Sequence, residues 1–157
     1  MSRTLVLIGL TLMSTFGIGQ VKDHGIRQLV VEKGGLDSTF VFGKWSEDGG
    51  TETHLKLLGE VNDTKGRRVK VITSSWIWGL GMRATNRILI FSGTNHFLGQ
   101  YEATTIHDLP VRMERGCMVF ENRPDEQCAA RGAERVDLTR GLPKRFFLEC
   151  KGEFVFY

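Results

Sequence analysis

The chain has 157 residues, a length that suits one domain able to bury a hydrophobic core without a metal ion. Its formal net charge is only +3, and residues of both signs alternate along the chain. Because a phosphate backbone requires a broad basic surface, we expect no nucleic-acid binding.

The N-terminal segment differs from the rest of the chain. Arg3 is followed by an apolar run over residues 4–19, and small residues stand at the −3 and −1 positions of a cut before Gln20. The run is shorter than the ~20 residues that span a bilayer. We predict a secretory signal peptide over residues 1–19 and a single β-rich domain over residues 20–157. The protein would then be periplasmic or secreted, without a stable membrane span after cleavage. A buried N-terminal strand or an uncleaved anchor is the alternative.

The mature chain alternates short apolar runs with glycine-rich or polar turns, a pattern typical of strands. The composition of nineteen glycines and three prolines agrees with many tight turns. The runs predict strands near residues 25–33, 38–45, 53–61, 67–78, 86–91, 96–103, 110–114, 117–121, 145–150 and 153–157. We expect an all-β, single-domain antiparallel barrel or sandwich of about 8–9 short strands.

Three details refine this expectation. The run at 86–91 is apolar on both faces, so it should lie centrally in a sheet. Glycine-containing turns at 62–66, 115–116 and 151–152 predict hairpins. One short helical turn is expected near 125–131, where a proline and an aspartate supply start signals and a glycine follows.

The stretch "SSWIWGLG" carries two tryptophans separated by one residue. Trp76 and Trp78 should share one face of a strand, while Ile77 points to the other. Such a pair beside glycines is typical of the rim of a ligand or partner site, and also of a plug at the end of a barrel. The candidate ligand- or partner-binding residues are Trp76, Trp78, His96 and Tyr101.

Catalytic and metal-binding patterns are weak. His96, His107 and Cys117 fall close together in the sequence, which leaves a Cys–His nucleophile pair or a metal site as an alternative. The histidines lack metal-binding spacing, and the chain carries no nucleophile elbow, P-loop or dinucleotide fingerprint. We therefore expect no catalytic residue, no metal ligand and no cofactor.

The chain contains three cysteines, none of them in a C-x-x-C pair. An oxidising compartment favours pairing of two of them. Cys117 opens an apolar strand and can be buried as a free thiol, whereas Cys128 lies in a polar segment and Cys150 ends a strand beside a turn. We predict a disulfide between Cys128 and Cys150.

The densest positive charge lies in "KGRRVK" at residues 65–70, at an expected hairpin tip. Solvated charge is the ordinary state of such a tip. A role in binding a partner is the alternative.

Two short fragments resemble known families. Residues 43–45, "GKW", are similar to the G-x-W motif of lipocalins, which implies an eight-stranded cup. Residues 92–101 resemble the core of META-type envelope domains, with Thr94 where that family has a cysteine. No functional residue follows from either resemblance.

These observations favour an exported, non-catalytic β-domain that acts as a binding or envelope-associated interaction module. Its partner would be an unidentified protein or small molecule. One alternative is a small-molecule carrier with a barrel interior lined by aromatic residues. The other is a small hydrolase with a His/Cys site.

Overall fold

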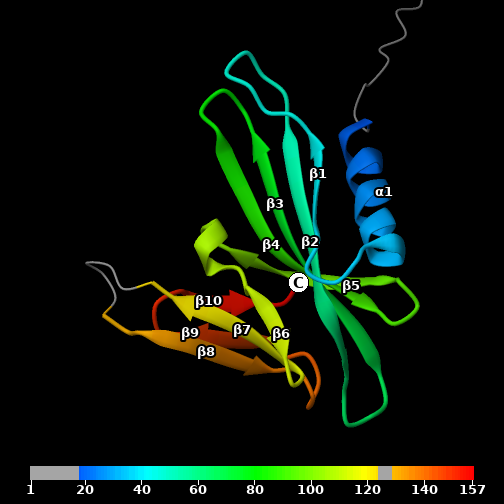
Figure 1. The fold of residues 1–157 in the computed structure, drawn as a ribbon, viewed down its shortest axis with the longest axis vertical. Coiled ribbons are helices and arrows are strands. Elements are labelled where there is room, and N and C mark those ends of the chain that lie inside the picture. Colours follow the sequence, from blue (N-terminus) through cyan, green and yellow to red (C-terminus); the bar gives the residue numbers. More distant parts are fainter. Residues whose placement is uncertain (1–17, 124–128) are drawn as a thin grey trace, which may run out of the picture.

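The computed structural model of the chain describes residues 18–123 and 129–157 (Figure 1). These residues form one α-helix, one 3-10 helix and ten β-strands, so the mostly β character predicted from the sequence is confirmed. In chain order the elements are α1 (Ile18–Lys33), β1 (Thr39–Gly43), β2 (Glu52–Asn62), β3 (Arg68–Trp78), β4 (Arg83–Ser92), β5 (Phe97–Ala103), η1 (Ile106–Asp108), β6 (Arg112–Glu114), β7 (Cys117–Asn122), β8 (Gly132–Asp137), β9 (Arg145–Leu148) and β10 (Gly152–Val155).

The strands of the described chain form three antiparallel sheets. The first contains β1 to β5 in sequence order, the second contains β6, β7 and β8, and the third pairs β9 with β10. Figure 1 shows the two small sheets beside one half of the long first sheet. The sheets formed by the described residues do not close into a barrel, so the cup implied by residues 43–45 is not formed.

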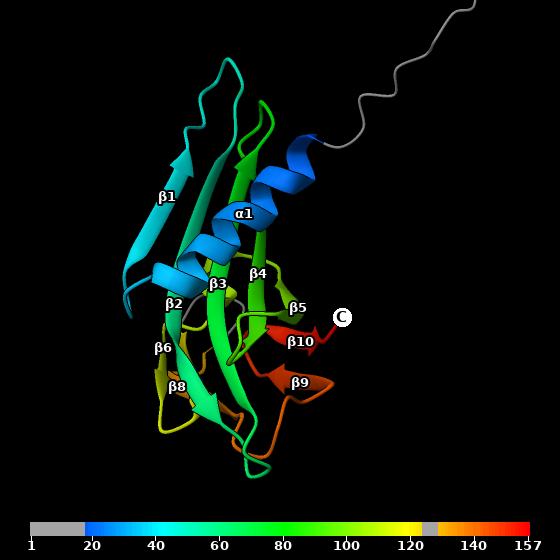
Figure 2. The same ribbon diagram turned by 90° about the vertical axis from the view of Figure 1, so that its right-hand side faces the viewer.

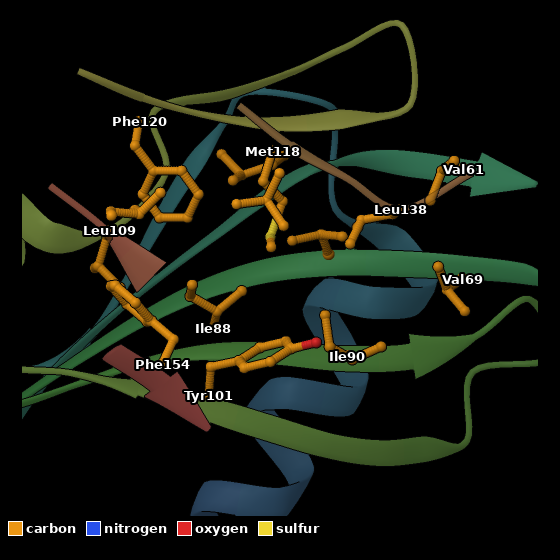
Figure 3. Packing of buried hydrophobic residues seen from close by; sticks show 14 residues of the cluster. Val61, Val69, Ile88, Ile90, Tyr101, Leu109, Met118, Phe120, Leu138 and Phe154 are labelled. Carbon is orange, nitrogen blue, oxygen red and sulfur yellow. The ribbon is translucent and has the colours of Figure 1, made fainter. Parts of the chain in front are cut away.

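Hydrophobic side chains cover both faces of the five-stranded sheet. Because side chains alternate along a strand, the neighbours Val71 and Ile72 enter different clusters. The larger cluster includes residues of all three sheets, and Ile88, Phe120 and Phe154 point toward one another there (Figure 3). The smaller cluster includes residues of α1, which crosses the opposite face of the sheet (Figure 2). The small sheets and α1 therefore bury opposite faces of one sheet.

β4 is an interior strand of the five-stranded sheet, with a neighbouring strand on each side, as residues 86–91 predicted. Ile88 and Ile90 enter the larger cluster, whereas Leu89 and Phe91 enter the smaller one. The strand pairs with β3 on one side and β5 on the other. Residues 88–91 are apolar on both faces of the strand, and such a run is stable here because both faces are covered.

The predicted hairpins are also confirmed. The turn at 62–66 joins β2 to β3, and the turn at 115–116 joins β6 to β7. The third hairpin joins β9 to β10, but its turn lies at residues 149–151, because Gly152 already pairs with Leu148. At 115–116 both residues have positive φ, 49° and 80°, as a two-residue turn of type I′ requires. Turn chemistry is local, which is why the sequence predicted these connections correctly.

The strand predicted for residues 25–33 is wrong, because these residues belong to α1. Val30 and Val31 are both buried against the sheet, whereas Leu29 is 43% exposed. Two adjacent residues can share the buried side of a helix, but they point to opposite faces of a strand. Branching at Cβ favours strands when packing does not decide, and packing decides here.

The helical turn predicted near 125–131 falls partly on residues 124–128, which lie outside the described residues. Residues 129–131 are not helical, and the next residues form β8. β8 pairs with β7 along its whole length, from Gly132 opposite Asn122 to Asp137 opposite Cys117. Pairing in the sheet thus outweighs the weak helical propensity of this segment.

Candidate functional site

Trp76 and Trp78 lie on the same face of β3, as their spacing predicted. Their rings are stacked, with centroids 5.6 Å apart and planes at 26°. Ile72, which shares this face, belongs to the cluster beneath α1. Neither tryptophan belongs to a core cluster, and Trp76 keeps 37% of its surface exposed. The pair therefore continues the apolar face of the sheet beyond the buried core.

Polar side chains of β4 hold the stacked pair. The strand register places Thr85 opposite Trp76 and Arg83 opposite Trp78. Trp78 Nε1 donates a hydrogen bond to Thr85 Oγ1 at 3.1 Å. The guanidinium carbon of Arg83 lies 5.6 Å from the centroid of the Trp78 ring, within the range of a cation–π contact. These contacts orient the Trp78 ring, and stacking on Trp78 orients the Trp76 ring.

The third tryptophan of the chain, Trp45, reaches the same end of the sheet from the connection between β1 and β2. Its Nε1 donates to the carbonyl of Gly79 at 2.7 Å. Gly79 has a φ of 70°, which glycine adopts without steric cost. This contact was not predicted, because no local pattern in the sequence links positions 45 and 79. The hydrogen bond joins the β1–β2 connection to the β3–β4 turn.

Glu52 stabilises the loop that carries Trp45. Its Oε2 accepts the backbone N–H of Trp45 at 3.3 Å, and its Oε1 lies beside His54 Nε2. The hydrogen bond from His54 is the main cause that lowers the pKa of Glu52, and the Trp45 N–H lowers the pKa further. Glu52 is therefore ionised, and available to both donors, in more acidic solution than an unperturbed glutamate.

The turn between β3 and β4 presents two apolar side chains to solvent. Leu80 is 74% exposed and Met82 is 57% exposed. Met82 has a φ of 49°, a left-handed conformation that few residues other than glycine adopt. Its N–H donates to the Gly79 carbonyl at 3.3 Å and closes the turn. We call the combined surface the tryptophan end; it consists of Trp45, Trp76, Trp78, Leu80 and Met82.

His96 lies far from the tryptophan end. It occupies the turn between β4 and β5, where Nδ1 lies 3.0 Å from Thr94 Oγ1 and the backbone N–H donates to Ser92 Oγ at 3.0 Å. Because Thr85 pairs with Trp76, the length of β4 between Thr85 and Ser92 separates the two sites by roughly 20 Å. The structure does not bring His96 together with the tryptophans.

Tyr101 lies in the larger core cluster and is fully buried. Its hydroxyl donates to the carbonyl of Pro143 at 2.7 Å, and its ring packs against Phe146 and Phe156 at centroid distances of 5.1 and 5.0 Å. Burial raises the pKa of its phenol. Tyr101 thus connects β5 to the C-terminal segments. Of the four candidate residues, only the two tryptophans lie together.

The residues that the sequence suggested for nucleophilic chemistry are dispersed. His107 lies in η1, and its backbone carbonyl accepts a hydrogen bond from Lys151 Nζ at 2.8 Å. Cys117 begins β7, and its Sγ lies 4.0 Å from the carbonyl of Arg115. No hydrogen bond among the described residues joins Cys117 to a histidine. Within the same part of the chain, no group of three or more His, Cys, Asp or Glu side chains is placed to hold a metal ion.

Two predictions, the disulfide and the signal peptide, concern residues that the structure describes only in part. Cys117 carries a free thiol. Cys128 lies outside the described residues, so its disulfide with Cys150 stays a prediction. The expected signal peptide at 1–19 lies outside them too, apart from its last two residues, which begin α1. Within residues 18–123 and 129–157, no helix has the length and hydrophobicity needed to cross a membrane.

The tryptophan end has the chemistry of a contact surface. Indole, leucine and methionine side chains bind through apolar area and do not exchange protons near neutral pH. No family model, curated protein or solved structure matches the chain. The function is therefore argued from this surface and its surroundings.

Proposed function

We propose that the protein is an exported, non-catalytic binding module that holds a partner protein at its tryptophan end. One observation carries this proposal: all three tryptophans of the chain gather at one end of the sheet, beside the exposed Leu80 and Met82. Aromatic residues and methionine are enriched at the centres of protein interfaces, and tryptophan is prominent among the residues that dominate binding energy.

The shape of this end favours a protein partner. The connections from β1 to β2 and from β3 to β4 project at one end of the sheet (Figure 1). A projecting apolar surface fits a groove on another protein, whereas small ligands are usually held in concave sites. The hydrogen bond from Trp45 to Gly79 joins the two projections before binding, which lowers the entropy lost when the partner docks.

The proposed location rests on the N-terminal pattern at residues 1–19. An exported module of this kind would work in the periplasm or outside the cell, as an envelope-associated or secreted protein. The two alternatives have less support. A carrier would need a cavity lined by Trp76, Trp78 and Tyr101, but Tyr101 is buried in the larger core cluster, away from the two stacked tryptophans. A hydrolase would need a His–Cys contact.

Site-specific photo-crosslinking tests the proposal. A photoreactive amino acid replaces Leu80 in the full-length protein, expressed in its native host, and the matched control replaces Phe147, which is 71% exposed on β9. We expect one protein to be crosslinked from position 80 and not from position 147. The same crosslinked protein from both positions, or none from position 80, would contradict the proposal.

The purified partner then allows a quantitative test. Trp76→Ala and Leu80→Ser should each raise the Kd at least about tenfold, the effect of removing a central interface residue. Phe147→Ser should leave the Kd unchanged. Because Trp76 is partly exposed, its replacement should lower stability by less than the roughly 3–5 kcal/mol that loss of a buried aromatic costs. An unchanged Kd in both variants contradicts the assigned surface.

A further inference from the structure

A cleft lies at the opposite end of the five-stranded sheet. It has a volume of about 750 Å³ and is bounded by the β2–β3 turn, the β4–β5 turn and the segment after β8. Backbone hydrogen bonds join these walls: Gly93 N–H donates to the Arg68 carbonyl, and Thr64 N–H donates to the Thr139 carbonyl, both at 2.7 Å. The volume lies within the range of roughly 300–1,000 Å³ that small-ligand sites occupy.

Aliphatic side chains supply the apolar part of the cleft. Val69 and Leu138 belong to the larger core cluster, and Leu142 packs against it. Leu98 also lines the cleft, and it remains 46% exposed. An exposed leucine beside the edge of the core is a surface that the apolar part of a ligand can cover.

Arg67 is held in place at the cleft by Asp63. The carboxylate accepts Arg67 Nε and Nη2 on Oδ2, both at 2.7 Å, and the backbone N–H groups of Lys65 and Arg67 on Oδ1 at 2.8 and 2.9 Å. Burial opposes ionisation of Asp63, but these hydrogen bonds outweigh it and lower its pKa. Arg67 keeps further N–H donors, and its side chain is 63% exposed.

Arg68 adds a second cation whose own charge is only partly compensated. Its Nε lies 3.6 Å from Glu60 Oε2, and the same carboxylate accepts Lys70 Nζ at 3.3 Å. One carboxylate thus serves two cations. The Arg68 side chain packs closely on Gly93, where a Cβ atom on any other residue would lie 2.7 Å from Nε. Positive charge therefore remains at the cleft, on the basic run at residues 65–70 noted in the sequence.

Neutral polar groups complete the lining. Ser92 Oγ and Thr94 Oγ1 lie 2.9 Å apart, and Thr94 Oγ1 also contacts His96 Nδ1 at 3.0 Å. Ser92 and Thr94 both line the cleft. The candidate residue His96 is thereby connected to this cleft through Thr94 and lies away from the tryptophan end.

We propose that this cleft binds a small amphipathic anion, whose oxyanion head group lies against Arg67 and Arg68 and whose apolar part covers Leu98 and Leu142. Guanidinium groups recognise carboxylate and phosphate through paired N–H donors, and adjacent hydroxyls supply further hydrogen bonds. The site is independent of the tryptophan end and gives the protein a second ligand.

Calorimetric titration of the full-length protein at low ionic strength tests this site. The probes are octanoate, octyl phosphate, 1-octanol and acetate, each below its micelle-forming concentration. We expect octanoate or octyl phosphate to bind at least tenfold more tightly than 1-octanol and acetate, and the tighter of the two identifies the head group. Equal affinity for 1-octanol, or no binding of either anion, overturns the proposal.

Variants locate the binding. Arg68→Gln should weaken binding of the anionic probe at least tenfold, whereas Arg145→Gln, at a 72% exposed side chain on β9, should leave it unchanged. Leu98→Glu and Leu98→Lys form a matched pair at one exposed position: both lose the apolar contact of the leucine, but only the carboxylate repels the anionic head group, so the Glu variant should bind at least tenfold more weakly than the Lys variant. Circular dichroism and thermal melts confirm that each variant is folded. Equal binding by both Leu98 variants overturns the proposal.

Discussion

Two side chains, Asp63 and Tyr101, each connect segments of the chain through contacts that depend on their protonation state. Asp63 accepts hydrogen bonds from backbone and side chain in the β2–β3 turn. Tyr101 donates from β5 to Pro143, 42 residues later in the sequence. Because the pKa of Asp63 is lowered and that of Tyr101 is raised, the two residues affect stability at opposite ends of the pH scale.

Replacement of Asp63 should be most harmful near neutral pH. A carboxyl whose pKa is lowered in the folded state stabilises the protein above its unfolded pKa of about 3.9, and this contribution is lost as pH falls through the folded value. Asp63→Asn should therefore lower the Tm at pH 7, and the gap to the wild type should narrow below about pH 4. Asp37→Asn, at a 66% exposed carboxylate, is the control. A gap independent of pH would refute this account.

Tyr101→Phe should separate hydrogen bonding from ionisation. At pH 7 the variant loses one hydrogen bond and about 1 kcal/mol of stability. The wild type should lose stability above about pH 10, because its unfolded chain ionises this phenol while the folded chain resists. The variant lacks that contribution, so its stability should fall less steeply. Urea unfolding between pH 7 and 11 measures how steeply the free energy of unfolding falls with pH in the wild type and in the variant. Equal slopes in the two proteins would contradict a role for ionisation of Tyr101.

At the level of elements, α1 shows how packing overrides local preference. The segment is rich in β-branched residues, yet it forms a helix across one face of the sheet because Val30 and Val31 reach the smaller core cluster together. The β2–β3 turn shows the reverse case, since residues 62–66 adopt the turn that their composition predicted. Long-range burial decides the first element and short-range chemistry decides the second.

Threonine substitutions in α1 test this packing. Val30→Thr and Val31→Thr each bury a hydroxyl and should each lower the free energy of unfolding by about 1–3 kcal/mol. Leu29→Thr, on the exposed side, should change it by roughly 0.5 kcal/mol or less. Chemical denaturation of the three variants provides the values. If the free energy of unfolding changes equally at positions 29 and 31 and differently at position 30, the segment has the periodicity of a strand, and this result would contradict the helix.

At the scale of the whole molecule, the two proposed binding surfaces lie at opposite ends of the long sheet. The tryptophan end is apolar and projecting, whereas the cleft at the other end is concave and cationic. The core clusters lie between them and cover both faces of the sheet. Each surface can therefore be altered without disturbing the other, so the two sets of variants serve as mutual controls.

The predicted disulfide between Cys128 and Cys150 would affect the stability of the whole molecule, because it would close a loop in the C-terminal half of the chain. On the chain-entropy estimate, closure of a loop of this size stabilises by roughly 3 kcal/mol. Reduction should therefore lower the Tm of protein recovered from an oxidising compartment. Non-reducing peptide mapping identifies the bond. Cys117 in the bond, or three free thiols, would refute the assignment.

Export predicts a mature chain that begins near Gln20. A cut there removes only the first two residues of α1, and Val30 and Val31, which dock the helix, lie well beyond it. The packed part of the fold is thus retained after cleavage. N-terminal sequencing of protein from the periplasm or medium measures the start. A chain that retains Met1 and remains in the cytosol would end the prediction of export.

Several features followed from local sequence alone. The strand class, the hairpin turns, the doubly buried β4 and the shared face of Trp76 and Trp78 depend on alternation and turn chemistry among neighbouring residues. The site was predicted only in part, because the two tryptophans were recognised while the contribution of Trp45 was not.

Tertiary structure decided the remaining features, because each requires segments that are distant in the chain to meet. The helical state of α1 depends on a sheet that forms later in the sequence, and the burial of Tyr101 depends on the C-terminal strands. The bond from Trp45 to Gly79 and the cleft around Arg68 each join separate hairpins. Local propensity contributes little to such contacts, since their free energy comes from the area buried and the hydrogen bonds formed only when the sheets and helix are assembled.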